Sequence, residues 1–319
     1  MQVRILTASD VCVALPMPKA IDAMKRAFGQ LSAGQAEMPL RTQISTGKGT
    51  TMLMPAYLRQ SQDFGIKIVS VYKNNPSRGL PLVTATVLVL DPQTGLPRAF
   101  IDGNSLTAIR TGAGGGVAAE LLARREVKTV ALFGAGVQAR AQLEAVRAVR
   151  SITQVNLISR TRASAQKLAE EIAAWTAAPT VNQVSTPRQA VQDADIVIAA
   201  TNSLTPLFDG NDLKPGAHVT GVGSYTSEMQ EVDAVTVQRA RVVVDSRVAC
   251  LADAGDIIIP QAKISAELGE ILNGLKPARQ SDDEITFFKS VGVAVQDAAA
   301  AAAVLGEAEA KGLGTIVEM

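Results

Sequence analysis

The sequence of 319 residues contains few of the residue types on which metal centres, disulfide frameworks and nucleic-acid interfaces depend. There is one histidine, His218, and the two cysteines, Cys12 and Cys250, are far apart, so neither a metal-ligand cluster nor a disulfide framework is expected. The 31 basic and 30 acidic residues give a net charge of +1, which argues against nucleic-acid binding. No apolar run is long enough to span a bilayer, and the N-terminus lacks the cationic start and apolar core of a secretory signal. These absences favour a soluble cytoplasmic enzyme.

Aromatic residues are also scarce, at 3 %, whereas apolar residues make up 47 % of the chain. We therefore expect a core built mainly from Ala, Val, Leu and Ile, and the composition argues against a disordered chain. The length is about twice that of a typical domain, which favours one large or two ordinary domains.

The first part of the chain is predicted to combine helices with an antiparallel or mixed sheet. Apolar positions at helical spacing predict a helix over 17–33, and a second helix is expected over 105–122 despite its glycines. Between them lie short apolar runs separated by turn residues, which predict strands over 41–45, 51–58, 65–72, 82–90 and 97–101.

After about residue 125 strands and helices alternate along the chain. This alternation is typical of a doubly wound α/β domain, in which helices connect parallel strands. Strands are expected over 127–133, 154–159, 181–184, 196–200, 218–222, 242–245 and 285–289, with helices over 137–149, 163–174 and 293–310.

A glycine-rich turn between the first strand and the first helix of this domain predicts a dinucleotide site. The segment Gly134-Ala135-Gly136-Val137-Gln138-Ala139 has the form G-x-G-x-x-A. Gly134 permits the tight turn, Gly136 lets backbone N–H groups approach a pyrophosphate, and Ala139 lets the helix pack closely on the strand. A purely structural turn is the alternative, but the strand before the turn and the helix after it favour NAD(P) binding through this loop and through Val137 and Gln138.

The residues after the second strand of this domain favour NADP(H), with NAD(H) possible. An acidic residue there would bind the ribose 2′-hydroxyl, but the sequence reads Ser159-Arg160-Thr161-Arg162. Guanidinium and hydroxyl groups suit a 2′-phosphate. The alternative is that Arg160 and Arg162 are solvated residues at the start of a helix.

Two later loops are further candidates for cofactor contacts. Thr201 follows the fourth predicted strand, and Val222 and Gly223 follow the fifth. Because loops at the carboxyl ends of parallel strands line the cofactor crevice, these residues are expected near the dinucleotide. Turn formation explains them equally well.

The first part of the chain contains three basic residues that suit an active site. Lys67 interrupts an apolar strand, and burial would lower its pKa toward the range of a proton donor or acceptor. Arg41 and Arg110 suit bidentate binding of a substrate carboxylate. An outward-facing lysine and two surface arginines remain the alternative.

A series of ordered motifs resembles the ornithine cyclodeaminase/mu-crystallin family over about residues 20–300. The motifs are Leu53-Met54-Pro55-Ala56, Gly65-Ile66-Lys67, Asn75-Pro76, Gly79-Leu80-Pro81, Leu90-Asp91, Thr94-Gly95-Leu96-Pro97, Asp102-Gly103, Leu106-Thr107-Ala108-Ile109-Arg110-Thr111, the glycine turn at 134–139 and Ser159-Arg160. The resemblance implies a homodimer formed through N-terminal domains, with a Rossmann domain that binds NAD(P). It implies a substrate-binding and dimerisation domain over 1–122, to which about 305–319 returns, and a Rossmann domain over 123–304.

The resemblance also implies hydride transfer between the nicotinamide and the α-carbon of an amino or imino acid. Arg41, Lys67 and Arg110 match the positions that hold the substrate carboxylate, and the lysine takes part in proton transfer. Thr86 is expected in the same pocket, and Gly292 lies in a stretch that approaches the nicotinamide.

Two departures from the family pattern bear on the substrate. Ornithine cyclodeaminases have an acidic residue at the position of Met52 and an Asp at that of Ser224, and both carboxylates handle the amine of ornithine. We therefore expect a reductase of a cyclic imine such as Δ1-pyrroline-2-carboxylate or Δ1-piperideine-2-carboxylate. An ornithine cyclodeaminase with bound NAD, in which Tyr225, Glu228 or Glu231 replaces the acid, and a non-catalytic NADPH-binding protein remain alternatives.

Overall fold

The computed structural model describes residues 1–319, which divide into two compact units. Unit 1 comprises Met1–Arg110 and Val293–Met319, and unit 2 comprises Thr111–Gly292. The boundaries expected after residues 122 and 304 therefore lie too late in the chain. Helix α3 (Gly103–Leu122) runs from one unit into the other, and its second half belongs to unit 2, where the Thr111 carbonyl accepts a 2.8 Å hydrogen bond from Gln142.

Unit 1 is a mixed sheet in the strand order β16-β1-β7-β6-β5-β4-β2, with β3 paired to β4. The expected strands and the helix over 17–33 are present. The strands are β1 (Gln2–Leu6), β2 (Ala36–Glu37), β3 (Thr42–Ser45), β4 (Thr50–Leu58), β5 (Asp63–Val71), β6 (Val83–Leu90), β7 (Pro97–Asp102) and β16 (Thr315–Glu318). The helices are α1 (Ala8–Ala14), α2 (Met17–Ser32) and α11 (Ala294–Lys311).

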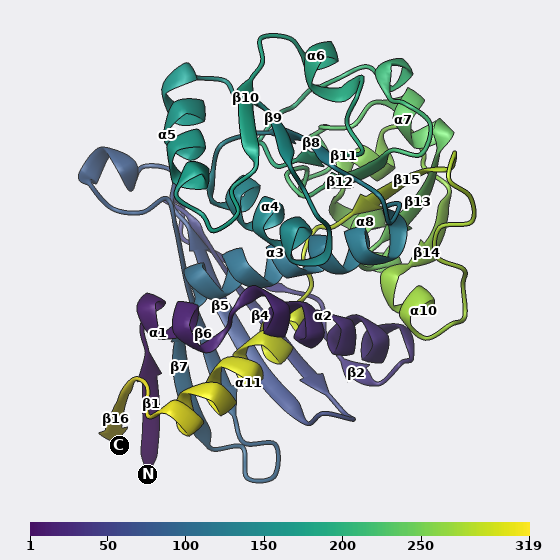
Figure 1. The fold of residues 1–319 in the computed structure, drawn as a ribbon. Coiled ribbons are helices and arrows are strands. Elements are labelled where there is room, and N and C mark those ends of the chain that lie inside the picture. Colours follow the sequence, from purple (N-terminus) through teal and green to yellow (C-terminus); the bar gives the residue numbers. More distant parts are fainter. The chain divides into compact units, whose positions relative to one another are not determined.

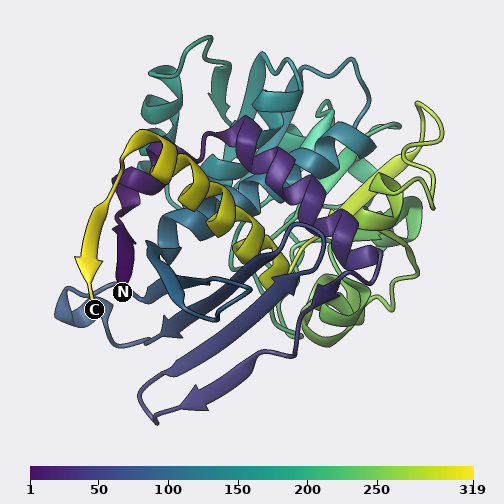
Figure 2. The same ribbon diagram turned by 90° about the horizontal axis from the view of Figure 1, so that it is seen from below.

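Helices α2 and α11 lie side by side across one face of this sheet (Figure 2). The alanine-rich sequence of α11 explains how closely the helix approaches β5, since Ala298 to Ala301 are buried. A side chain on Gly65 of β5 would meet the backbone of Ala298 at 3.2 Å. The N-terminal part of α11 therefore lies directly over β5, the strand that carries Lys67.

The two ends of the chain meet in the sheet of unit 1. The placement of the C-terminal segment in this unit agrees with the expected return of about 305–319, whereas the pairing of the two terminal strands was not predicted. Strand β1 is parallel to β7 and antiparallel to β16 (Figure 1). The N-terminal ammonium of Met1 lies 2.7 Å from the Met319 carbonyl oxygen.

Unit 2 is a parallel sheet in the order β10-β9-β8-β11-β12-β15-β13-β14, which confirms the doubly wound prediction. Its strands are β8 (Thr129–Phe133), β9 (Gln154–Ile158), β10 (Thr180–Gln183), β11 (Ile196–Ala199), β12 (His218–Gly221), β13 (Ala240–Val244), β14 (Ile264–Glu267) and β15 (Ile285–Lys289). Its remaining helices are α4 (Val137–Val149), α5 (Arg162–Ala173), α6 (Pro187–Val191), α7 (Ala234–Arg239), α8 (Arg247–Asp253), α9 (Gly255–Ile258) and α10 (Leu268–Leu272). The order reverses at β8, which has β9 on one side and β11 on the other.

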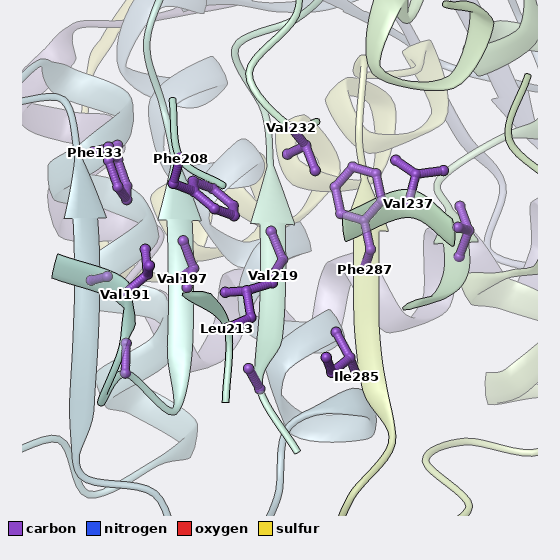
Figure 3. Close-up of a cluster of buried hydrophobic side chains, with 14 of the residues drawn as sticks. Phe133, Val191, Val197, Phe208, Leu213, Val219, Val232, Val237, Ile285 and Phe287 are labelled. Atoms are coloured by element: carbon purple, nitrogen blue, oxygen red, sulfur yellow. The ribbon is translucent and has the colours of Figure 1, made fainter. Parts of the chain in front are cut away.

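The central strands of unit 2 are buried on both faces. Alternate residues of β8 point into different hydrophobic clusters, with Phe133 in one and Leu132 in the other. In the cluster drawn in Figure 3, the rings of Phe133 and Phe208 lie 5.4 Å apart between centroids. A strand buried on both faces has little freedom to shift, so it fixes the loops at its carboxyl end.

His218 of β12 is part of this interior. The ring is fully buried and is hydrogen-bonded to Thr286 at 2.9 Å and to Thr220 at 3.0 Å. Burial, together with the charges of Arg279 and Arg150, lowers the pKa of His218 to about 3, so the ring is neutral at physiological pH.

None of the helices in either unit combines the length and the apolarity that a bilayer crossing demands.

Candidate active site

A cavity of about 990 Å³ opens in unit 2 at the carboxyl ends of β8, β9 and β11. Eight residues that the sequence predicted for cofactor binding line it: Gly134, Gly136, Val137, Gln138, Ser159, Arg160, Thr161 and Thr201. The prediction missed other lining residues, namely Phe133, Ala135, Ile158, Ser164, Pro187, Ala200, Asn202, Ser203 and Leu207. Five of these, Phe133, Ala135, Ile158, Ala200 and Asn202, are next to predicted positions in the sequence.

The glycine turn has the backbone geometry that pyrophosphate binding needs. Gly134 adopts a φ of 102°, and a Cβ at this position would lie 2.5 Å from the Ala200 carbonyl oxygen. Gly136 is the extended N-cap of α4, and no side chain caps the helix. Ala139 is fully buried against the strand. The uncapped N–H groups at the start of α4 and the absence of an acidic residue in its first turn suit an anion.

A buried polar atom in the same cavity supports the fit of a polar ligand. Gln138 lines the cavity, and its Oε1 atom is buried without a hydrogen-bond partner. A buried acceptor of this kind is costly unless a donor satisfies it. The residues present therefore fit a dinucleotide, which offers both phosphate oxygens and hydroxyl donors.

The end of β9 contributes a basic and hydroxyl-rich wall. Thr161 caps α5 by accepting a hydrogen bond from the Ser164 N–H, and the Ser159 and Ser164 hydroxyl oxygens lie 3.0 Å apart. Arg160 lines the cavity, whereas Arg162 is exposed in the first turn of α5 and does not line it. No carboxylate is among the lining residues.

The remaining residues predicted for cofactor binding do not line this cavity. The Gly223 N–H donates to Glu231, and the Gly292 N–H donates to Asp245 at 2.9 Å. Val222 is half-buried and its N–H bonds to the Ala199 carbonyl. All three lie in loops that continue from the carboxyl ends of β12 and β15, so the expected topology is correct and their role in cofactor binding stays a prediction.

Unit 1 contains a buried cluster of charged side chains. Lys67 and Arg110 are only 3 % and 4 % exposed. The alternative that these two side chains lie on the surface is therefore excluded. The Lys67 Nζ atom lies 2.7 Å from Oδ2 of Asp297. The Arg110 Nε donates to Oδ1 of the same carboxylate at 2.9 Å, and Nη1 donates to Gln296 Oε1 at 2.9 Å. One carboxylate from the first turn of α11 thus bridges the lysine of β5 and the arginine of α3.

The electrostatics of this cluster lower the proton affinity of the lysine. Burial lowers the pKa of Lys67, the attraction of Asp297 opposes this lowering, and the charges of Arg110 and Arg41 add to it. Together these effects bring the pKa to about 8. Arg41 therefore acts on Lys67 as well, from the segment just before β3. Two cations, Lys67 and Arg110, thus share one carboxylate, which leaves a positive potential suited to an anionic ligand.

The strand register decides which neighbours share the face of Lys67. Met54 and Val87 are directly opposite Lys67 on β4 and β6, and Met52 lies two residues along β4, so Met52 is on the same face as expected. Thr86 is paired with Ile68 and therefore points to the other face of the sheet. The expectation that Thr86 lines the pocket of Lys67 is wrong, because adjacent residues of a strand point to opposite faces.

Ser224 is not available to a ligand in unit 2. Its side chain is fully buried, its hydroxyl donates to the Met229 carbonyl at 2.6 Å, and its oxygen accepts from the Asp256 N–H at 3.3 Å. The expectation that Ser224 lines the substrate pocket therefore does not fit, since its hydrogen-bonding capacity is used within the loop.

Gln296 and Asp297 belong to the buried cluster of charged side chains in unit 1 but were not predicted from the sequence. A signal was present, because they are a polar pair directly before the apolar run Ala298–Leu305 of an alanine-rich helix. Both are at most 1 % exposed, and a buried polar pair in such a helix requires polar partners.

The model of the ornithine cyclodeaminase/mu-crystallin family matches residues 1–312. A Δ1-pyrroline-2-carboxylate reductase of Bacillus cereus is 36 % identical, over 98 % of this chain and 99 % of its own length. The structure of a Thermococcus litoralis Δ1-pyrroline-2-carboxylate reductase with NADH and L-proline superposes with a TM-score of 0.93 at 39 % identity, covering 98 % of this chain and 99 % of that one. An archaeal alanine dehydrogenase dimer with bound NAD superposes with a TM-score of 0.91 at 32 % identity over the full length of both chains. The motifs, the fold of each unit and these similarities agree, and the chain belongs to the ornithine cyclodeaminase/mu-crystallin family.

Proposed function

We propose that the protein is an NAD(P)H-dependent reductase that converts a cyclic imino acid of the Δ1-pyrroline-2-carboxylate or Δ1-piperideine-2-carboxylate type to the corresponding amino acid. The observation that carries this proposal is the buried bridge from Lys67 through Asp297 to Arg110. It supplies a proton donor of suitable pKa and a cationic site for a carboxylate, which are the two groups that an imino acid requires. The similarity to the two Δ1-pyrroline-2-carboxylate reductases over nearly the full length supports the same reaction.

The substrate carboxylate is assigned to the two arginines. Arg110 is fixed through Nε and Nη1, so its Nη2 is the donor that receives the carboxylate, together with the guanidinium of Arg41. An arginine already held by two hydrogen bonds loses little conformational entropy on binding. Positioning of the carboxylate in this way orients the α-carbon.

Lys67 is the proposed donor of the proton that the imine nitrogen receives. When bound, a reduced nicotinamide would supply the hydride for the new bond at C2, as the C=N π bond breaks toward nitrogen. The Lys67 ammonium gives its proton to that nitrogen and is left as a neutral amine, which solvent reprotonates. The Asp297 carboxylate forms an ion pair with the ammonium in the ground state and holds it in place. The cofactor would be held by the turn of Gly134 and Gly136 and by the wall at the end of β9.

We further propose that NADP(H) is preferred over NAD(H). The argument is the guanidinium of Arg160 and the hydroxyl of Thr161 in the cavity wall, with no carboxylate there to repel a 2′-phosphate. The two similar structures described above carry NADH or NAD, so NAD(H) remains a usable cofactor for the family.

The substrate is proposed to lack a distal amine. Met52 places an apolar thioether on the face of Lys67, at the position where the family's cyclodeaminases have a carboxylate. Glu231, a possible replacement, is fully buried and hydrogen-bonded to backbone N–H groups in unit 2, so it has no free oxygen for an amine. A cyclic imine fits this environment better than ornithine.

The protein is also proposed to form a homodimer through the sheet of unit 1. Helices α2 and α11 cover the face of Lys67, whereas the opposite face carries Ile44, Leu53, Ile66 and Ile68. Ile44 and Ile68 are 52 % and 38 % exposed, and apolar side chains gathered on one face of a sheet suit an interface with a second copy.

The test is oxidation of NADPH and NADH in the presence of Δ1-pyrroline-2-carboxylate, Δ1-piperideine-2-carboxylate and pyruvate with ammonia, with ammonia release from ornithine measured in parallel. The proposal expects cofactor oxidation with a cyclic imine and no ammonia from ornithine. Ammonia release without net cofactor consumption would identify a cyclodeaminase. Cofactor binding without turnover of any imine would leave only a binding protein.

A further inference from the structure

Glu231 joins two loops of the Rossmann sheet from inside unit 2. Its Oε1 atom accepts from the N–H of Thr201 at 2.5 Å and from the Thr201 hydroxyl at 2.7 Å. Its Oε2 atom accepts from the Gly223 N–H at 2.7 Å. Thr201 follows β11 and Gly223 follows β12, so one carboxylate connects the carboxyl ends of two neighbouring strands.

The chemistry of these bonds requires a carboxylate. The Thr201 oxygen accepts from the Ser203 N–H at 3.1 Å, which leaves the Thr201 hydroxyl hydrogen for Glu231. Glu231 therefore receives three donors, and an amide could accept at only one of its two ends. Because Glu231 is fully buried, a donor that lost its bond to this carboxylate could not be satisfied by bulk water, and its desolvation would cost free energy.

The backbone around Glu231 is held by a buried ion pair of Asp256 and Lys289. The N–H groups of Glu231 and Val232 donate to Asp256 Oδ1 at 2.7 and 2.9 Å. The Oδ2 atom of Asp256 lies 3.1 Å from Nζ of Lys289, at the end of β15, and all three charged side chains are fully buried. Burial raises the pKa of Glu231, while the Lys289 charge and the Thr201 bonds oppose that rise. The ion pair of Lys289 and Asp256 thus orients the segment that presents Glu231.

We propose that Glu231 is a positioning residue for the dinucleotide, which it serves by holding Thr201 in the wall of the nucleotide cavity and Gly223 beside it. Thr201 lines the cavity, so any movement of its backbone changes the surface that the ligand meets. Gly223 has no room for a side chain, because a Cβ would collide with the Thr201 carbonyl oxygen. The loops of Thr201 and Gly223 therefore pack directly against each other, and the hydrogen bonds of both to the Glu231 carboxylate fix the distance between them. This inference rests on the proposal that the cavity binds a nicotinamide dinucleotide.

The decisive variant is Glu231→Gln, with Glu228→Gln as its control. Glu228 is an exposed carboxylate in the same loop, and it accepts a 3.3 Å hydrogen bond from the hydroxyl of Thr226. Binding of NADH is measured by titration of the fluorescence of NADH, without substrate. Glu231→Gln is expected to raise the dissociation constant about tenfold, the effect of losing a hydrogen bond to a buried charge, whereas Glu228→Gln leaves it unchanged. In turnover, the KM for the cofactor rises while the KM for the imine at saturating cofactor stays constant.

Unchanged NADH affinity in folded Glu231→Gln would overturn the inference, as would an equal rise in both KM values. If the wild-type protein itself does not bind NADH, the proposed function fails instead. Should Glu231→Gln not fold, Thr201→Val and Thr201→Ser give a second test. Only serine retains the hydroxyl that donates to Glu231, so Thr201→Val should weaken NADH binding more than Thr201→Ser, and equal affinities would contradict the proposal.

Discussion

The Lys67 ammonium and the Asp297 carboxylate lie 2.7 Å apart and are both nearly inaccessible to solvent. They come from β5 and from the first turn of α11, near opposite ends of the chain. Asp297 also holds Arg110, so it connects the proposed proton donor with the proposed carboxylate site. An ammonium that is buried beside two arginines would lose its proton easily, and Asp297 is the group that opposes this loss.

The first prediction concerns the pH dependence of imine reduction. Because the protonated form of Lys67 is required and its pKa is about 8, kcat/KM should fall as the pH rises through about 8. Asp297→Asn removes the attraction that raises this pKa, so the falling limb should move to lower pH by roughly one unit or more. The charged groups around Lys67 are Asp297, Arg110 and Arg41, whereas the residues opposite it on β4 and β6 are apolar.

The control is Glu307→Gln, which removes a carboxylate farther along the same helix that pairs with Lys19 and Lys311. This variant should keep the wild-type pH profile. A profile of Asp297→Asn that coincides with that of the wild type would exclude the assignment of the limb to Lys67.

The second prediction is that Lys67→Met abolishes proton donation but not cofactor binding. Methionine retains the apolar stem of the lysine, and Asp297 keeps its bond to Arg110, so the fold should persist. Loss of a positioned general acid typically lowers the rate about 10² to 10⁴-fold. Steady-state kinetics should show a loss of kcat in this range, while NADH titration gives the wild-type dissociation constant because the nucleotide cavity is lined by residues of unit 2. Full turnover in Lys67→Met would refute the proposed mechanism.

Much of the fold could be predicted from the sequence because its signals are local. The glycine turn at 134–139 is confirmed as the link between β8 and α4, and the alternation of strands and helices after residue 125 is confirmed as a parallel sheet. Strands β1 and β16 were missed because each is short and is defined mainly by its pairing with a distant segment. The boundaries of the units were misplaced because α3 is one continuous helix that passes from unit 1 to unit 2.

The candidate site was less predictable, because its geometry depends on contacts between distant segments. The role proposed for Lys67 came from the family resemblance, since a lysine between two isoleucines also fits an exposed strand position. Thr86 was misplaced because the face that it occupies is set by its register with β5, which local sequence does not reveal. The bonds of Glu231 to Thr201 and Gly223 likewise appear only once β11 and β12 are adjacent.

The third prediction tests the choice of cofactor. Arg160→Ala removes a guanidinium from the cavity wall at the end of β9, where the 2′-phosphate is expected. The KM for NADPH should rise about tenfold, whereas that for NADH should change little, since only NADPH carries the extra phosphate. Lys167→Ala is the matched control, because it removes an exposed cation from α5 that does not line the cavity. An equal effect of Arg160→Ala on both cofactors would remove the basis for an NADPH preference.

The fourth prediction concerns the exposed face of the sheet in unit 1. Ile68→Asp places a charge among Ile44, Leu53 and Ile66, and burying that carboxylate in an apolar interface would be costly. Because Ile68 is 38 % exposed in the single chain, the substitution should leave the folded unit intact. Light scattering should therefore give a monomer mass for Ile68→Asp and a dimer mass for the wild type. Leu275→Asp, at a 66 % exposed position of unit 2, should remain dimeric, and a dimeric Ile68→Asp would place the interface elsewhere.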